Sequence, residues 1–412
     1  MKTESKSHLE GLAESWGNFQ LSLLEDLSKG ISSKHIAYLA MEGMKEFYGD
    51  NSYEIKQIGI GVNDSCNLAC RQCFYDSTFH PQNKTKGNMG LDEWKRVIDK
   101  GIESGVEIYS IMGKEPFLTP NITLGIIEHL QKHQEVDWEM VTNGTLIPKH
   151  ERKIRTVKDS VGFSPRYMAV SFDGYKESHD KIRGNGSYHQ AKKGLEALKS
   201  LEIEGRTISH TIMEENVDDF HLMVKDLSEI GAQNFNLEFY FPTHTNKKLL
   251  DDNRKIYALE RIIEQIEINQ IDLDGIISIN LHADDHPKLI ADLHKSNYFG
   301  REIHIGENFG PSFMIPIKKE NPRTVVNVGV LPTMFFHGFR IEHTGKVMDY
   351  CADLRSPKRA IGFGDVKDAP IKELIKISRE KIWPEFTDRY FERLSKAFRG
   401  EDVKMVTGWY SQ

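Results

Sequence analysis

Two apolar periodicities alternate along this chain, and this alternation constrains the fold more than any other feature of the sequence. From Tyr53 onward, segments with apolar residues at every second position alternate with segments that repeat every three or four residues. The first pattern is typical of strands and the second of amphipathic helices. The expected strands are residues 55–62, 106–112, 136–142, 167–172, 207–213 and 235–241. Strands separated by helices form right-handed βαβ units, so we predict an α/β fold with parallel strands in an open or partial barrel.

Segments of different pattern flank this region. Before it, apolar residues at three- and four-residue steps predict two amphipathic helices that pack as a cap on a larger core. Towards the end of the chain the alternation breaks down, and two short strands followed by two helices predict a small α+β appendage. The predicted division is a helical segment at 1–52, the barrel at 53–285 and a C-terminal region at 286–412.

Charge, hydropathy and cysteine content exclude several classes of protein. The net charge is −7 with both signs mixed along the chain, which disfavours nucleic acid as a partner. The sequence has no signal-peptide pattern and no apolar run of about 18 residues, so we predict neither secretion nor a membrane span. Four cysteines in 412 residues are too few for a disulfide scaffold, and we therefore expect a protein of the reducing cytoplasm.

Three of the cysteines form the most specific motif of the sequence. The segment CNLACRQC at 66–73 places Cys66, Cys70 and Cys73 in the spacing C-x3-C-x2-C, directly after the first expected strand. Three thiolates do not complete a four-ligand zinc site, but they can hold three irons of a [4Fe–4S] cubane and leave the fourth iron open. The alternative is a zinc site completed by a distant histidine or by Cys351. The seventeen histidines are scattered, and we predict no second metal site.

Four further motifs follow the cysteines, each near the end of an expected strand: GKEP at 113–116, TNG at 142–144, SFDG at 171–174 and IRG at 182–184. With this order of motifs, residues 53–245 resemble the radical S-adenosylmethionine (SAM) superfamily. The resemblance implies a partial (β/α)6 TIM-like barrel and an enzyme that uses a [4Fe–4S] cluster and SAM. Barrel active sites assemble where these motifs lie, at the carboxyl ends of the strands.

The resemblance also implies roles for particular residues. Cys66, Cys70 and Cys73 would bind the cluster. The expected SAM contacts are Gln72, Gly113, Glu115, Thr142, Asn143, Ser171, Asp173 and Arg183. The residue types agree, because a carboxylate such as Glu115 accepts from an ammonium and a guanidinium such as Arg183 binds a carboxylate, the two ends of the methionine in SAM. Two positions depart from the family pattern: Gln72 replaces an aromatic residue and Lys114 replaces the second glycine of GGEP.

The C-terminal region resembles the start of a SPASM or twitch domain, which carries auxiliary iron–sulfur clusters. After the cysteine motif the sequence has a single further cysteine, Cys351, so we expect one cluster only. Without an auxiliary cluster to accept an electron, a redox-neutral outcome such as epimerisation, rearrangement or radical addition is favoured. In related epimerases a thiol returns hydrogen to the substrate radical, and Cys351 is the candidate here. The competing interpretation is that Cys351 is a small buried apolar residue.

The predicted function is therefore hydrogen abstraction from a peptide or a small metabolite, driven by an external one-electron reductant of flavodoxin or ferredoxin type. The 50 residues before the barrel are too few for a leader-peptide-binding winged helix of the usual size, which weakens the peptide option. The alternative chemistry is oxidative dehydrogenation or cross-linking of a peptide. The alternative class is a non-catalytic or zinc-binding barrel scaffold. No oligomeric state is predicted.

Overall fold

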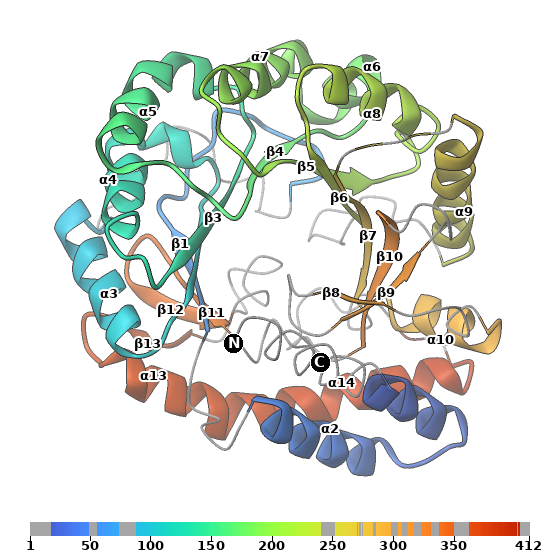
Figure 1. The fold of residues 1–412 in the computed structure, drawn as a ribbon. Coiled ribbons are helices and arrows are strands. Elements are labelled where there is room, and N and C mark those ends of the chain that lie inside the picture. Colours follow the sequence, from blue (N-terminus) through green and yellow to red (C-terminus); the bar gives the residue numbers. More distant parts are fainter. Residues whose placement is uncertain are drawn as a thin grey trace, which may run out of the picture.

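The described part of the chain forms one continuous, mostly parallel sheet with helices around it (Figure 1). The computed structural model describes residues 18–48, 56–73, 88–239, 252–269, 271, 273, 275–282, 286–297, 304–306, 312–316, 323–330, 338–349, 362–401 and 403. No helix in these ranges is long and apolar enough to cross a membrane.

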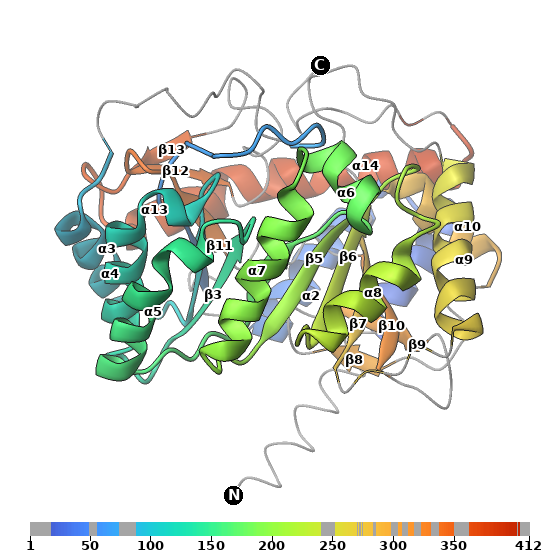
Figure 2. The same ribbon diagram turned by 90° about the horizontal axis from the view of Figure 1, so that it is seen from above.

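Six parallel strands form the barrel wall in the order of the sequence. They are β1 (Gln57–Gly61), β2 (Ile108–Met112), β3 (Asp137–Thr142), β4 (Met168–Ser171), β5 (Arg206–Ile212) and β6 (Asn234–Phe239). The intervening helices cover the outside, as Figures 1 and 2 show: α3 (Leu91–Glu103), α4 (Pro120–Leu130), α5 (Ile147–Val161), α6 (Lys176–Arg183), α7 (Ser187–Ser200) and α8 (Phe220–Glu229). This confirms the α/β partial barrel predicted from the alternating periods.

The packing of α3 shows how the sequence places a helix on the sheet. Its buried residues are Trp94, Val97, Ile98 and Gly101, which recur at three- and four-residue steps and form one apolar face. A glycine is needed at the last position because an added Cβ would collide with the hydroxyl of Tyr109 from β2. That hydroxyl donates to the carbonyl oxygen of Ile98 at 2.9 Å.

The strands that follow the barrel extend both edges of the sheet. On one side, β7 (Ile277–His282) and β10 (Thr324–Gly329) continue in parallel and are followed by antiparallel β9 (Ser312–Pro316) and β8 (His304–Gly306). On the other side, β11 (Gly338–Ile341) lies parallel to β1 and is followed by antiparallel β12 (Lys346–Asp349) and β13 (Gly362–Asp365). The sheet is thus continuous across residue 286, and the division predicted at 52/53 and 285/286 stays a prediction.

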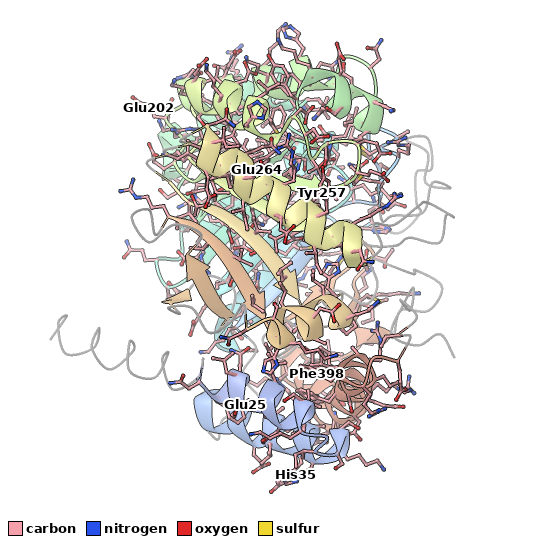
Figure 3. All side chains as sticks on the ribbon, turned by 90° about the vertical axis from the view of Figure 1, so that its right-hand side faces the viewer. Glu25, His35, Glu202, Tyr257, Glu264 and Phe398 are labelled. Carbon is pink, nitrogen blue, oxygen red and sulfur yellow. The ribbon has the colours of Figure 1, made fainter. Side chains whose placement is uncertain are left out.

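Helices from both ends of the sequence lie side by side across the opening of the barrel (Figure 1). Residues 18–28 and α2 (Ser33–Tyr48) lie beside α14 (Trp383–Phe398), where the hydroxyl of Thr387 donates to Sδ of Met41 at 3.4 Å. Three further helices complete the outer layer: α9 (Asp252–Ile268), α10 (Pro287–Lys295) and α13 (Ile371–Ile377). Figure 3 shows Phe398 at the end of α14 beside α10, and its ring lies 5.4 Å from that of His294.

Candidate active site

The three motif cysteines lie in the loop that follows β1, at the carboxyl end of the barrel strands. All three are half-buried, and none of the three forms a disulfide. Burial raises the pKa of Cys66 to about 12 and also raises the pKa of Cys70. Metal ligation requires the thiolate form, which a bound cation stabilises. The three thiols share one half-buried loop and fit an iron centre, because a bound cation would favour the ionisation that burial opposes at Cys66 and Cys70.

Glu115 connects the loop after β2 to the end of β3. Its side chain is fully buried, and its two oxygens accept hydrogen bonds from three donors: the backbone N–H of Phe117 at 3.0 Å, the Thr142 hydroxyl at 2.8 Å and the backbone N–H of Asn143 at 2.8 Å. Burial raises the pKa of Glu115, and these three donors oppose that shift. The carboxylate therefore fixes the position of Asn143 relative to the GKEP loop.

Asn143 in turn contacts the cysteine loop. Its Nδ2 lies 3.7 Å from Sγ of Cys66 and donates to Oδ1 of Asn67 at 2.9 Å. The side chain of Asn67 donates to the Thr145 hydroxyl at 2.8 Å, which closes the ring of contacts. Gly144 permits this tight turn, because its φ is +75° and an added Cβ would collide with Val170. The ends of β2 and β3 thus hold the first cysteine in place.

Asp173 organises the other side of the site. This fully buried carboxylate accepts from Nε of Arg183 at 2.5 Å, from the side-chain amide of Gln72 and from the backbone N–H of Thr211 at 2.8 Å. Burial is the largest single influence and pushes its pKa upwards, but the Arg183 guanidinium, His210 and the hydrogen bond from Thr211 together outweigh burial, so the pKa of Asp173 lies below its ordinary value. The sequence analysis placed Gln72, Asp173 and Arg183 in three separate motifs, and the fold joins them in one hydrogen-bonded group.

A buried histidine accepts a hydrogen bond from the backbone of Asp173. Nδ1 of His179 accepts from the backbone N–H of Asp173 at 3.2 Å, and burial lowers the pKa of His179 to about 3. The imidazole is therefore neutral at physiological pH and keeps its acceptor nitrogen. Arg183 remains charged, and its guanidinium interacts electrostatically with Cys70 and Cys73. One positive charge thus lies between Asp173 and the cysteine loop.

The remaining predicted contacts occupy different environments. Gly113 has φ of +148°, and an added Cβ would press on the backbone of Asn63, so this turn requires glycine. Lys114, the departure from the family pattern, is half-buried. Ser171 is buried at the end of β4. Cys351, the candidate hydrogen donor, lies outside the described residues.

The structure also adds two polar residues that the sequence analysis missed. Asp64 precedes the cysteine motif, and His343 lies two residues after the end of β11, which pairs with β1. Nε2 of His343 lies 3.9 Å from Oδ2 of Asp64, and both side chains are largely buried. The C-terminal region thereby contributes to the same end of the sheet as the cysteines. A sequence signal was present, because residues 335–343 were expected to form one of the two short strands of the C-terminal region, but the pairing of that strand with β1 was not predictable from the pattern.

Comparison with known proteins finds a family match for the barrel region of the chain. Residues 60–227 match the family model described as the Radical SAM superfamily. The subtilosin biosynthesis protein AlbA of Bacillus subtilis is 28% identical over 173 residues, which are 41% of this chain and 36% of that protein. The AdoMet-dependent heme synthase of Nitratidesulfovibrio vulgaris is 29% identical over 197 residues, 47% of this chain and 50% of that protein. In both cases the chain spans at most half the length of the curated relative.

Solved structures show the same fold over a longer part of the chain. Streptococcus suis SuiB has a TM-score of 0.56 at 12% identity and covers 86% of this chain and 73% of its own. The structure of anSMEcpe with bound AdoMet has a TM-score of 0.53 at 16% identity and covers 81% of this chain and 83% of its own. At these identities the likeness concerns the fold. It extends beyond residues 60–227 into the strands and helices that follow the barrel.

Proposed function

Because this chain belongs to the radical SAM superfamily, whose enzymes use a [4Fe–4S] cluster and SAM, we propose that Cys66, Cys70 and Cys73 hold that cluster. SAM would bind at the open iron. The observation that carries this assignment is the convergence of five separate motifs: Glu115 and Asn143 reach the first cysteine, while Arg183 lies beside the other two. A zinc-binding or non-catalytic scaffold does not explain why an acidic and a basic group flank the same three thiols.

We assign the methionine part of SAM to these two charged groups. The Glu115 carboxylate suits the ammonium, and the Arg183 guanidinium suits the carboxylate, since its Nε is held by Asp173. The chemistry supplied by the cofactors, when bound, is reductive cleavage of SAM and hydrogen abstraction by the resulting 5′-deoxyadenosyl radical. The protein's own part is to orient both reactants and to exclude water from the mouth.

The proposed substrate is a peptide, with a small metabolite as the second candidate. Two likenesses support the peptide: AlbA is a bacteriocin biosynthesis protein, and SuiB has been solved bound to the precursor peptide SuiA. The heme synthase and the probable GTP 3′,8-cyclase of Methanococcus maripaludis, 27% identical over 191 residues, support a small molecule. Both groups match this chain in the barrel region, and we therefore propose that the loops and strands that follow the barrel select the substrate.

We propose a redox-neutral reaction, because the sequence contains one cysteine beyond the cluster motif and no set for an auxiliary cluster. The Cys351 thiol would transfer a hydrogen atom to the substrate radical. An external one-electron donor of flavodoxin or ferredoxin type, together with a proton, would then restore the thiol from the thiyl radical. We therefore propose that the enzyme works in the reducing cytoplasm, where such donors and free thiols persist.

The test is anaerobic turnover of the cluster-loaded enzyme with SAM, dithionite and candidate peptides in deuterated water. We expect 5′-deoxyadenosine and a product that gains one deuterium, because the thiol exchanges with solvent. The variant Cys351→Ala should still form 5′-deoxyadenosine but lose the product. A product that has lost two hydrogens would instead establish oxidation or cross-linking, and full product yield from Cys351→Ala would remove Cys351 as the donor.

A second proposal concerns Asp64 and His343. Both lie at the barrel mouth, and an imidazole paired with a carboxylate suits proton transfer to or from the substrate. We expect His343→Gln to slow product formation by about 100-fold, the usual contribution of a general acid or base. The affinity for SAM and the melting temperature should stay close to wild type. An unchanged product rate, or a parallel loss of SAM affinity, would show that the pair is structural.

A further inference from the structure

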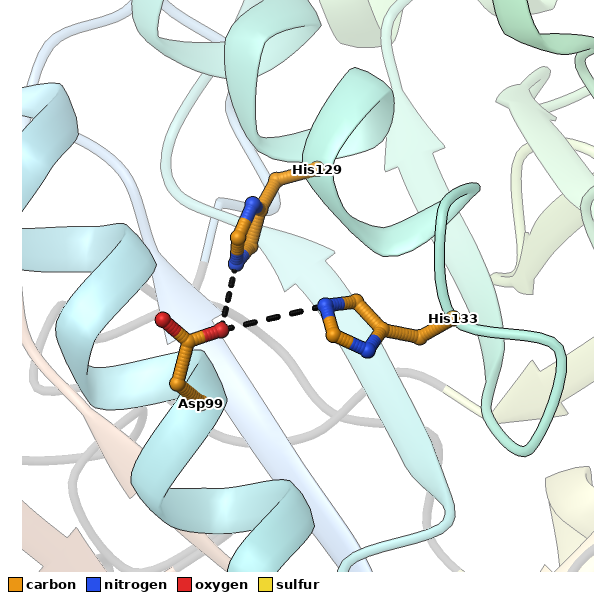
Figure 4. Close-up of side chains that lie close together, drawn as sticks. All are labelled: Asp99, His129 and His133. Carbon is orange, nitrogen blue, oxygen red and sulfur yellow. Dashed lines mark hydrogen bonds and ion pairs between the residues drawn. The ribbon is translucent and has the colours of Figure 1, made fainter.

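A second group of metal-binding side chains lies on the outer helices of the barrel. Asp99 is in α3, His129 is in the last turn of α4, and His133 lies three residues beyond that helix. Nε2 of His129 lies 2.6 Å from Oδ1 of Asp99, and Nε2 of His133 lies 3.8 Å from the same oxygen. Figure 4 shows both imidazoles directed at this one carboxylate.

The local backbone explains why the two histidines share a face. They are four residues apart, and helix-like turns continue past α4: the N–H of Lys132 donates to the carbonyl of His129 at 3.1 Å, and the N–H of His133 to that of Leu130 at 2.9 Å. Residues at this spacing lie above one another on a helical surface. The imidazole centroids are 5.2 Å apart. The neighbouring α3 then supplies the carboxylate, which joins two consecutive helices of the outer layer.

The donor set suits a borderline divalent metal ion. Imidazole nitrogens and a carboxylate oxygen bind Zn²⁺ at about 2.0–2.2 Å, which in a tetrahedral site separates the ligand atoms by about 3.3 Å. The observed separations of 2.6 and 3.8 Å bracket this value, and the three ligand atoms all lie within 4.8 Å of one another. Side-chain exposures of 46% for Asp99, 17% for His129 and 29% for His133 leave the site open to an ion and to water.

A further carboxylate occupies the position expected outside such a site. Oε1 of Glu135 lies 3.5 Å from Nδ1 of His133, the ring nitrogen that faces away from Asp99. Metal-bound histidines characteristically donate their second ring N–H to a carboxylate, which orients the ring and raises its basicity. The group therefore has three ligands and an outer carboxylate, and a plain hydrogen bond between His129 and Asp99 would need neither His133 nor Glu135.

We propose that Asp99, His129 and His133 bind one Zn²⁺ ion, with water in the fourth position. The sequence analysis predicted no second metal site, and this proposal departs from that prediction. The segment HLQKH at 129–133 has two histidines four residues apart, a spacing that the sequence analysis passed over. The ion fastens α3 to α4 on the outside of the barrel. This inference is independent of the proposed radical chemistry.

Zinc titration of the untagged, cluster-loaded protein by anaerobic calorimetry tests the proposal. We expect one Zn²⁺ per chain, no binding by the double variant His129→Gln/His133→Gln, and affinity about tenfold lower in Glu135→Gln. The matched control His189→Gln removes an exposed histidine from α7 and should bind zinc like wild type. Circular dichroism of each variant shows whether its fold is intact.

X-ray absorption at the zinc edge distinguishes this site from the cysteine loop. We expect nitrogen and oxygen ligands at about 2.0–2.2 Å and no sulfur near about 2.3 Å. The variant Cys66→Ala/Cys70→Ala/Cys73→Ala, which lacks the competing thiols, should still bind one zinc. The proposal is overturned if wild type binds no zinc, if the double histidine variant binds it equally well, or if the spectrum shows sulfur ligands.

Discussion

We expect the triple variant Cys66→Ala/Cys70→Ala/Cys73→Ala to form no detectable 5′-deoxyadenosine and to retain no iron after anaerobic reconstitution. The sequence has three cysteines in the loop after β1, and removing them takes away the thiols that the described part of the structure places beside Arg183 and Asn143. The assay is chromatographic quantification of 5′-deoxyadenosine after incubation with SAM and dithionite, together with colorimetric iron and sulfide analysis.

Two controls separate loss of the cluster from loss of the fold. Without iron, wild type and the triple variant should melt at similar temperatures, since burial keeps the pKa of Cys66 high and the thiol neutral. Cys351→Ala, a matched cysteine-to-alanine change outside the motif, should retain about four irons per chain. Iron retention by the triple variant, or its loss in Cys351→Ala, would contradict the assignment of the ligands.

Glu115→Gln is expected to give the second largest effect. The replacement keeps the shape of the side chain but removes the charge, and its amide NH2 must face at least one of the three donors that the carboxylate now accepts. A hydrogen bond to a charged group contributes about 1.5–3 kcal/mol, so the KM for SAM should rise by about 10 to 100-fold. Initial rates of 5′-deoxyadenosine formation at varied SAM concentration measure this change.

Thr142→Val serves as the matched control for Glu115. It removes one of the three donors and leaves the carboxylate in place. The resemblance places Thr142 among the SAM contacts, but its hydroxyl donates to Glu115, so we expect the melting temperature to fall and the KM for SAM to rise less than in Glu115→Gln. If Thr142→Val raises the KM as much as Glu115→Gln, the carboxylate acts by holding the end of β3 and not through the SAM ammonium. A wild-type KM in Glu115→Gln would remove Glu115 from the SAM site altogether.

Much of this site was predictable from the sequence because its parts are local. The motifs directly follow alternating strands, and the carboxyl ends of parallel strands meet at one mouth. Pattern alone therefore indicated that Glu115, Asn143 and Arg183 would converge with the cysteines. The hydrogen bonds between these motifs were not predictable. Gln72 and Arg183 both donate to Asp173, and this arrangement depends on how α6 returns to the strand ends.

Other parts depend on long-range pairing that periodicity does not encode. β11 lies beside β1 although 281 positions separate the paired residues Ile60 and Ile341 (341 − 60), and this pairing brings His343 close to Asp64. The tail was therefore expected as an appendage, whereas its strands extend both edges of the barrel sheet. Likewise Asp99 meets His129 only through the packing of α3 on α4, so the sequence showed the histidine spacing but not the third ligand.

The most direct test of the central claim is electron paramagnetic resonance of the reduced, reconstituted wild-type protein before and after addition of SAM. The account predicts about four irons per chain and the spectrum of a single reduced [4Fe–4S] cluster that changes when SAM binds to its open iron. A protein without iron and visible absorption whose zinc is bound by sulfur ligands, or a cluster spectrum that SAM leaves unchanged, would contradict it.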